Sequence, residues 1–346
     1  MKKLTLVTDP VFQKSRKSTT EEYLVQFIRD ERDLPFVKLI IRISITLVPL
    51  AVLLYLPFVT GWLWIVIAVL YHYYNNIIYK GPFGLMLHCT SHRVLFKQKH
   101  HKLNYIIPWF LAPFFGHSPE TYYAHHIGMH HAENNLEDDD SSTMPYQRDS
   151  LKGFLKYFGN FLVIGMYNLA MYFYRRHRKK LFYKTVRGEL LFIFFCTALC
   201  FVNAPATIVV FIIPYILYRL IAFIGNWAQH AFIGADEPFN SYKNSVTCIN
   251  TPYNHKCWND GYHISHHIKP AMHWTEHPLY FQKTIDEYAK QDAIVFDGIH
   301  FLHIFFYLMR KRYDLLAFHF VNVGNRYKND EEVIAMLKER TRPVPF

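Results

Sequence analysis

The chain has 346 residues, of which 51% are hydrophobic and 18% aromatic, while only 19% are charged. This composition excludes a disordered, collagen-like or highly charged protein. The formal net charge of +11 suits either a nucleic acid or the anionic inner face of a membrane as a partner. Five cysteines, none of them in a close CxxC pair, exclude a disulfide scaffold and a cysteine-based zinc ribbon.

The first 35 residues are mixed and polar, which predicts a cytosolic N-terminal segment and no cleavable signal peptide. Within this segment, Ser18 and Glu21 have the spacing of a capping box, so we expect a short amphipathic helix to begin there. Its apolar face predicts a position along the membrane surface.

Two stretches without any charged residue follow, residues 43–79 and 190–218. A single helical pass through a bilayer needs about 20 apolar residues. Each stretch is broken near its middle, at 60–61 and at 203–205, so each predicts a hairpin of two transmembrane helices. Buried core helices of a soluble protein are the alternative, but such helices carry a polar stripe that these stretches lack. The expected fold class is an all-α, multi-pass membrane protein with four transmembrane helices.

Two further apolar stretches are expected not to cross the membrane. Residues 104–116 are too few for a crossing and contain two prolines, which predicts a re-entrant or interfacial piece. Residues 157–174 are numerous enough, but their glycines, asparagines and tyrosines are typical of a helix at the interface. A crossing at 157–174 would also separate the histidine motifs that lie before and after it.

Basic clusters predict the orientation of the chain. The clusters at 97–102, 175–180 and 310–312 fall on the side opposite the two uncharged hairpin turns, and the positive-inside rule assigns that side to the cytoplasm. The net charge is thereby explained by membrane lipids. No nucleic acid is expected as a partner, because no RNA- or DNA-binding module is visible.

Nine of the 21 histidines form a pattern on the predicted cytoplasmic side. They make an HxxxH motif, an HxxxHH motif, a lone histidine after the fourth membrane helix and an HxxHH motif: His88 and His92; His126, His130 and His131; His230; His263, His266 and His267. His125 is a spare beside the second motif.

Neutral imidazole is a ligand for zinc, copper, iron or nickel. Nine imidazoles are too many for one four-coordinate zinc ion and suit two metal ions. Carboxylate-bridged di-iron bundles use Glu-x-x-His, and no glutamate in this chain has a histidine three residues later. The pattern therefore predicts a centre of two metal ions with nitrogen ligands.

The three motifs in this order, spread over two hairpins, resemble the integral-membrane fatty acid desaturase and hydroxylase superfamily from about Phe36 to Pro278. Asn226 and His230 are similar to that family's asparagine and extra histidine at the end of the fourth helix. The acidic segment after the second motif is similar to the alkane monooxygenase branch. The resemblance implies a cytosolic histidine-rich cap in which the nine histidines bind two non-haem iron ions, with O2 as co-substrate.

The same resemblance implies a long-chain acyl or alkyl lipid as the substrate. It also implies electrons from a separate cytochrome- or ferredoxin-type protein, because neither end of the chain is long enough for a haem-binding domain. Asn226, Asn259 and Asp260 are expected to support the metal ligands from a second layer. Glu133 and Asp138–Asp140 are further candidates for this second layer, although a solvated acidic loop is the favoured interpretation of the run 137–140.

The expected function is oxygen-dependent, di-iron desaturation of a long fatty acyl chain, with hydroxylation of an alkyl chain by the same type of centre as the alternative. We expect residues 1–35 to be an N-terminal segment, 36–278 the membrane domain with its cap, and 279–346 a cytosolic tail. The location is a bacterial inner membrane or the endoplasmic reticulum, with the active site facing the cytoplasm.

A second motif favours different chemistry. His273, Glu276 and His277 form HxxEH, a zinc-peptidase pattern that requires a helix presenting both histidines on one face. Pro270 precedes the motif and Pro278 follows it at once, so only about two helical turns are available. A membrane zinc peptidase is therefore the less favoured alternative.

Overall fold

The computed structural model describes residues 1–4 and 6–345. Most of these residues are helical, and their contacts divide the chain into two compact units. The helical unit consists of Gln13–His126 and Ala170–Leu220, and the mixed unit consists of Met1–Phe12, Ile127–Leu169 and Ile221–Phe346. The division of the sequence into three consecutive parts stays a prediction.

The helical unit is built from α-helices, 3-10 turns and π-helical segments. Its elements in chain order are α1 (Thr19–Val25), η1 (Glu31–Asp33), α2 (Leu34–Tyr55), α3 (Gly61–His72), η2 (Tyr73–Tyr79), α4 (Lys80–His92), η3 (Gln98–Tyr105), η4 (Ile106–Leu111), η5 (Ala112–Phe115), α5 (Thr121–His125), α8 (Lys179–Thr207) and η7 (Ile208–Ile212). The segments η2, η4 and η7 are π-helical. π-Helical segments are rare in proteins, and those that occur often lie at functional sites.

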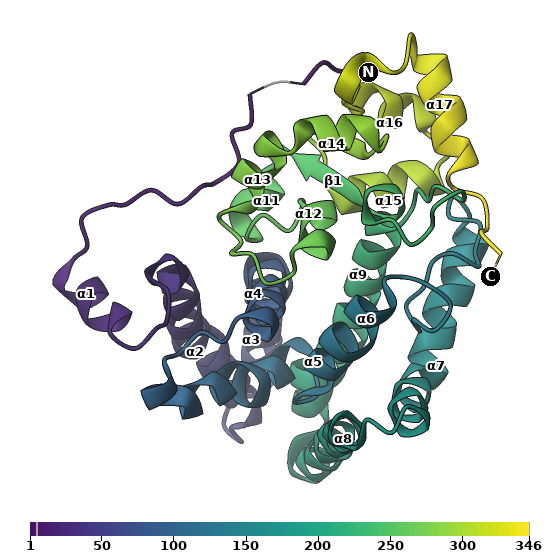
Figure 1. The fold of residues 1–346 in the computed structure, drawn as a ribbon. Helices are drawn as coiled ribbons and strands as arrows, with labels where there is room; N and C mark the ends of the chain where they lie inside the picture. Colours follow the sequence, from purple (N-terminus) through teal and green to yellow (C-terminus); the bar gives the residue numbers. More distant parts are fainter. Residues whose placement is uncertain (5, 346) are drawn as a thin grey trace. The chain divides into compact units, whose positions relative to one another are not determined.

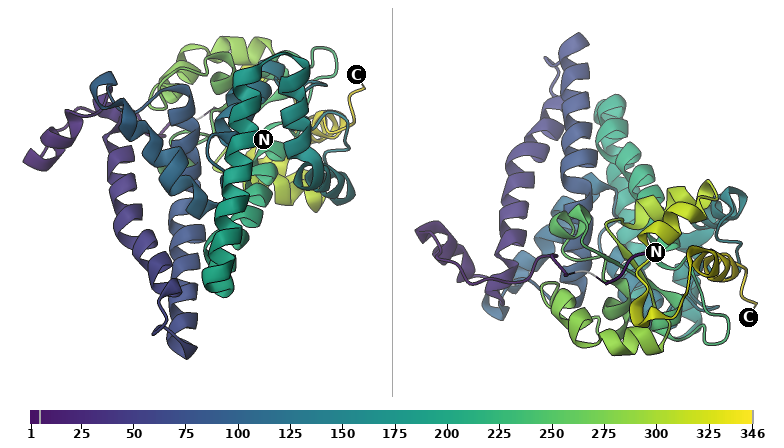
Figure 2. Two further views of the ribbon diagram at one scale, coloured as in Figure 1. Left: turned by 90° about the horizontal axis from the view of Figure 1, so that it is seen from below. Right: turned by 90° about the horizontal axis from the view of Figure 1, so that it is seen from above.

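Local sequence signals explain where the first helices begin. The backbone N–H of Ser18 donates to the Glu21 carboxylate over 2.8 Å, and the N–H of Glu21 donates to Ser18 Oγ over 3.3 Å, which confirms the capping box at α1. The turn of the first predicted hairpin is also confirmed, because α2 ends at Tyr55 and α3 begins at Gly61 with a φ of +57°. Figure 2 shows α2 lying beside the helical run that continues from α3 through η2 into α4.

Two helical segments of the described chain are long and apolar enough to cross a membrane, Glu31–Tyr55 and Lys179–Gln229. The second is 51 residues long, and its backbone is non-helical at Asn203 (φ −159°, ψ 96°), within the predicted turn of the second hairpin. α7 (Leu151–Arg175), which includes the expected interface helix, is not among them. Four crossings and the cytoplasmic orientation stay predictions.

The mixed unit combines short helices with a pair of strands. Its elements are α6 (His131–Glu133), most of α7, the end of α9 (Ile213–Gln229), α10 (Ser241–Asn244), β1 (Val246–Ile249), α11 (Pro252–Lys256), α12 (His263–Ile268), α13 (His277–Lys283), α14 (Ile285–Lys290), β2 (Ile294–Asp297), α15 (Phe301–Met309), α16 (Tyr313–His319), η8 (Val323–Asn325) and α17 (Asp330–Glu339). The π-helical segment η6 (His126–His130) leads into α6.

The strand pair corrects the expectation of an all-α fold. β1 and β2 pair in parallel, with Val246 opposite Ile294 and Ile249 opposite Asp297. Each strand is only four residues long and fully buried, so neither has the alternating pattern from which a strand is predicted. The connection between them carries α11 to α14, and the third histidine motif lies on α12 within this connection. In Figure 1, β1 lies among these green helices.

The N-terminal arm of the chain is part of the mixed unit. Lys2 forms a parallel bridge with Val321, and the Asp9 carboxylate accepts hydrogen bonds from the Tyr262 hydroxyl (2.6 Å) and the Asn250 backbone N–H (2.8 Å). Tyr262 is fully buried and directly precedes His263. The arm therefore supports the start of the helix that presents the third histidine motif.

Candidate metal centre

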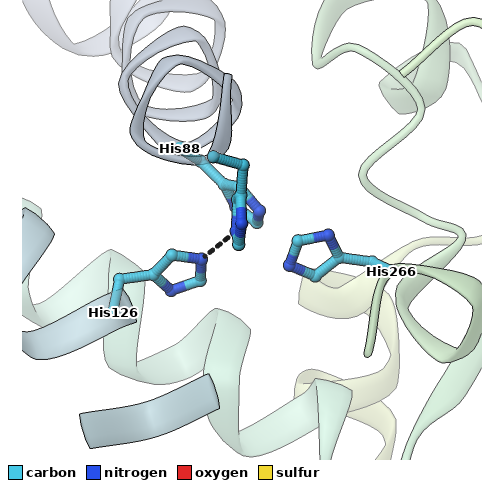
Figure 3. A group of neighbouring side chains, drawn as sticks. His88, His126 and His266 are labelled. Carbon is cyan, nitrogen blue, oxygen red and sulfur yellow. Dashed lines mark hydrogen bonds between the residues drawn. The ribbon is translucent and has the colours of Figure 1, made fainter. Parts of the chain in front are cut away.

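Three histidines converge in the helical unit. His88 and His92 project from successive turns of α4, and His126 follows the end of α5. The ring centroids of His88 and His126 are 4.4 Å apart, and His92 Nε2 lies 3.0 Å from His126 Nε2. Figure 3 shows the side chains of His88 and His126 approaching the same space from their two segments. The HxxxH spacing predicted that His88 and His92 share a helix face, because residues i and i+4 do so, and the structure places them in this way.

Four histidines converge in the mixed unit. His130, His230, His263 and His267 each offer one ring nitrogen, and these nitrogens all lie within 4.8 Å of one another. They come from η6, the residue after α9, and two successive turns of α12. His263 Nε2 lies 3.1 Å from His230 Nε2 and 3.0 Å from His267 Nε2. All four belong to the nine histidines singled out in the sequence, three of them in the motifs and His230 as the lone histidine.

The opposite nitrogens of two of these rings are held by acceptors. His130 Nδ1 lies 2.7 Å from Asp139 Oδ2, and both side chains are buried. His230 Nδ1 lies 2.7 Å from the backbone carbonyl oxygen of Asn244. A carbonyl oxygen can only accept, so Nδ1 of His230 carries the proton and Nε2 presents a lone pair. An acceptor of this kind on the outer nitrogen is typical of metal-binding histidines.

The charge state of the cluster favours a cation. Burial lowers the pKa of His230 to about 3 and that of His267 well below its ordinary value, so both rings are neutral at physiological pH. Neutral rings that face each other at 3.0–3.1 Å oppose their lone pairs unless one of them donates. His263 Nε2 carries at most one proton, which cannot form good hydrogen bonds to both His230 and His267. One metal ion would accept the lone pairs of all these nitrogens.

The two remaining motif histidines form a pair in the mixed unit. His131 Nε2 lies 2.9 Å from His266 Nε2, and their ring centroids are 4.7 Å apart. His125, the additional histidine beside the second motif, belongs to neither converging group. The donor set of the described residues is therefore rich in neutral nitrogen, which fits a transition metal such as iron or zinc and does not suit calcium or magnesium.

A comparison with protein families identifies this pattern. The family model described as "Fatty acid desaturase" matches residues 78–298, which is more than half of the chain and includes all nine motif histidines. The chain belongs to the fatty acid desaturase family. Membership implies an oxidoreductase of the desaturase or hydroxylase type. No curated protein and no solved structure matches the chain.

In this desaturase family member, the acidic run after the second motif is not a solvated loop throughout, which corrects that interpretation. Asp138 is exposed, but Asp139 is buried and its Oδ1 accepts hydrogen bonds from the backbone N–H (2.9 Å) and hydroxyl (2.6 Å) of Ser141. Buried carboxylates need such donors. Glu137 and Asp138 are exposed while Asp139 is buried, a difference that depends on the fold of the loop and that four consecutive acidic residues do not reveal.

The three predicted supporting residues lie in the mixed unit with other hydrogen-bond partners. Asn226 Nδ2 donates to the Ser141 carbonyl (2.9 Å) and to the Tyr157 hydroxyl (2.8 Å). The Asn259 side chain donates to two backbone carbonyls, those of Pro10 and Trp274. The Asp260 carboxylate accepts from the hydroxyl of Tyr253 at 2.7 Å, and burial raises the pKa of Asp260 to about 6. Their role as supports of the metal ligands stays a prediction.

The peptidase motif of the desaturase-like chain does not have the geometry that its chemistry requires. α13 begins at His277, so His273 lies outside the helix and the two histidines do not share a helical face. His273 Nδ1 lies 2.8 Å from the Thr275 hydroxyl, and His277 Nδ1 lies 2.7 Å from the Ser265 hydroxyl. Both rings are buried as hydrogen-bonding parts of the mixed unit.

Asp139 provides a test of the second layer of the centre. We expect Asp139→Asn to lower activity by about 10–100-fold, because an amide cannot hold the His130 ring as a carboxylate does. Steady-state turnover and bound metal per chain would both be measured, with the exposed neighbour substitution Asp138→Asn as the control. Equal activity of the two variants would show that Asp139 does not orient a metal ligand.

Proposed function

We propose that this protein is an oxygen-dependent, non-haem di-iron desaturase that introduces a double bond into a long fatty acyl chain. The observation that carries the proposal is the group of His130, His230, His263 and His267, whose nitrogens converge while the outer nitrogens of His130 and His230 are held by acceptors. Membership in the fatty acid desaturase family supports the choice of iron and of substrate.

The nine motif histidines divide between two irons in this proposal. The four converging histidines of the mixed unit hold one ion, and the remaining five complete the set of nine nitrogen ligands: His88, His92, His126, His131 and His266. Bound iron with O2 and two electrons supplies the strong oxidant that an unactivated C–H bond requires. The protein residues hold the ions and keep them apart from water, and Asp139 and the Asn244 carbonyl keep the protons of His130 and His230 on Nδ1.

The apolar surface of the two long helical segments supports a lipid substrate and a location in a membrane. The two segments Glu31–Tyr55 and Lys179–Gln229 fit a lipid environment, and many of their large apolar side chains are exposed, such as Ile45, Phe194 and Phe201. Such surfaces suit contact with membrane lipids. We infer a multi-pass protein of a bacterial inner membrane or the endoplasmic reticulum, with its active site on the cytoplasmic side.

A separate electron-transfer protein would deliver the two electrons. The basic cluster at 175–180 is exposed along its whole length, which suits an acidic partner. The second basic cluster is less suitable, because Lys311 pairs with Asp149 and Arg312 pairs with Asp314. We expect turnover with a soluble donor to fall as salt rises, since salt screens exposed charges. A rate that is flat between low and high salt would remove electrostatic docking from the account.

Hydroxylation of the alkyl chain is the alternative outcome, and lipid mass spectrometry distinguishes it. The chain would be expressed in a host that lacks the activity, and host lipids would be compared with those of cells carrying a His263→Ala variant. Desaturation yields products lighter by two hydrogens. Products heavier by one oxygen would replace the desaturase with a hydroxylase, and unchanged lipids under supply of iron, O2 and a reductase would contradict both.

A further inference from the structure

A buried lysine lies in the helical unit. Lys80, the first residue of α4, is 3% exposed, and its Nζ has no hydrogen-bond partner among the described residues. An ammonium group in apolar surroundings is costly unless an acceptor or a negative charge meets it.

A second buried nitrogen accompanies it. His117 is 8% exposed, and its Nε2 likewise has no hydrogen-bond partner among the described residues. Both groups lie against the ring of Tyr218: Lys80 Nζ is 5.7 Å from the ring centroid, and the His117 ring centroid is 3.9 Å from it. Lys80 and His117 therefore offer donors from two segments around the same aromatic ring.

The surrounding structure holds these two groups in place. The Asn75 side chain, in the π-helical segment η2, donates to the Phe114 carbonyl over 2.7 Å, and the rings of Phe83 and Phe115 are stacked with centroids 4.0 Å apart. These contacts hold η5, which ends two residues before His117, against η2 and against α4, the helix that carries Lys80. The arrangement is a built feature of the fold, because it uses buried polar bonds as well as apolar packing.

The charges near this place leave one cation in excess. Arg219 Nη1 donates to the Gly116 carbonyl over 2.8 Å, and Arg219 Nη2 lies 3.6 Å from the Glu189 carboxylate. Arg219 and Glu189 thus balance each other. Lys80 forms no ion pair within the described chain. A single negative charge with acceptor oxygens would complete the group.

We propose that Lys80 and His117 bind the carboxylate end of a long alkyl chain, so that the substrate is a fatty acid with a free carboxylate. This inference rests on the proposed action on alkyl chains, whose apolar part suits the helical unit. Lys80 lies eight residues before His88 on α4, which corresponds to about 12 Å along the helix axis. A chain anchored at Lys80 extends along α4 toward His88. The flexible four-carbon stem of lysine allows its ammonium to follow the carboxylate.

The test is a binding measurement on the metal-free protein in lipid nanodiscs, which is independent of any oxidation chemistry. Palmitate labelled with 13C at its carboxyl carbon would be titrated and followed by NMR, beside hexadecanol and hexadecyl phosphate as uncharged and phosphate-headed probes. We expect palmitate to bind the wild-type chain and Lys80→Met to weaken it by about tenfold to a hundredfold, the range for a lost charge-assisted hydrogen bond. Hexadecanol should bind both proteins alike.

Thermal unfolding separates this role from a structural one. Lys80→Met removes an uncompensated buried charge, so we expect it to raise the unfolding midpoint while it weakens palmitate binding. Lys80→Gln serves as the second variant, and Lys99→Met changes an exposed lysine of the same unit as the control. Unchanged palmitate affinity in Lys80→Met, tighter binding of hexadecyl phosphate than of palmitate, or a lowered midpoint would overturn the proposal. Binding without any desaturated product would instead refute the proposed function alone.

Discussion

Substitution of His230 by alanine is expected to abolish turnover and to remove about one iron per chain. His230 lies outside the three motifs, yet its Nε2 lies 3.1 Å from His263 Nε2 and its Nδ1 meets the Asn244 carbonyl. Alanine leaves one metal ion with three of its four proposed nitrogen ligands. The oxidant cannot form when an iron is displaced. The loss of activity should therefore be far larger than the roughly 10–100-fold expected for Asp139→Asn, which changes only a partner of a histidine.

Iron content and activity would be measured on purified His230→Ala, with His255→Ala as the matched control. His255 is exposed and belongs to no histidine motif, so its removal should change neither quantity. If His230 were only a hydrogen-bonded residue at the end of α9, the variant would retain full iron content and substantial activity. That outcome would remove His230 from the centre.

The second large effect is expected on stability, at Arg148. This side chain is fully buried, and among the described residues its guanidinium donates to backbone carbonyls alone. Nε donates to Ala231 (3.1 Å), Nη1 donates to Thr143, Met144 and Tyr146 at 3.0–3.2 Å, and Nη2 donates to Arg340 (3.1 Å) and Arg342. Burial lowers the pKa of Arg148 to about 9, which still leaves it cationic at neutral pH.

Arg148 therefore joins three segments of the mixed unit: the loop after the second histidine motif, the residue after His230 and the C-terminal tail. Each buried carbonyl left without a donor costs about 1–3 kcal/mol, although entering water satisfies part of them. We expect Arg148→Ala to reduce the free energy of unfolding by roughly 3–5 kcal/mol and to release metal from the neighbouring centre. Thermal unfolding followed by tryptophan fluorescence would measure the loss.

Arg310→Ala is the control for Arg148, because Arg310 is exposed at the end of α15. The unfolding midpoint of Arg148→Lys should lie between those of Arg148→Ala and Arg310→Ala, since an ammonium supplies three donors where a guanidinium supplies five. An unfolding midpoint of Arg148→Ala equal to that of Arg310→Ala would contradict the role of Arg148 as the joint of the mixed unit.

The convergence of the histidines could be predicted from the sequence because their spacing encodes their geometry. HxxxH and HxxHH bring side chains to one face of a helix, and the structure places His88 with His92 and His263 with His267 in this way. The hairpin turns at Gly61 and Asn203 could be predicted because turn-forming residues interrupt the two uncharged stretches there. Both signals are local, so one sequence is enough to read them.

Which groups hold the outer nitrogens of the histidines could not be decided from the sequence, although Asp139 was among the acidic candidates, because the choice depends on how separate segments fold together. The acceptor for His230 Nδ1 is a backbone carbonyl, which has no side-chain signature. Asp139 differs from its exposed neighbour Asp138 only in how the loop folds. β1 and β2 are short buried runs that become strands by pairing with each other across four helices. Residue type alone does not contain this information.

The most direct measurement is the metal content of the purified wild-type chain, produced with iron and zinc both available in the medium. Elemental analysis should find two irons and essentially no zinc per chain, since the proposed centre has nine nitrogen ligands for two ions and family membership favours iron. A single zinc per chain, or full activity after iron has been removed by a chelator, would contradict the di-iron centre on which the account depends.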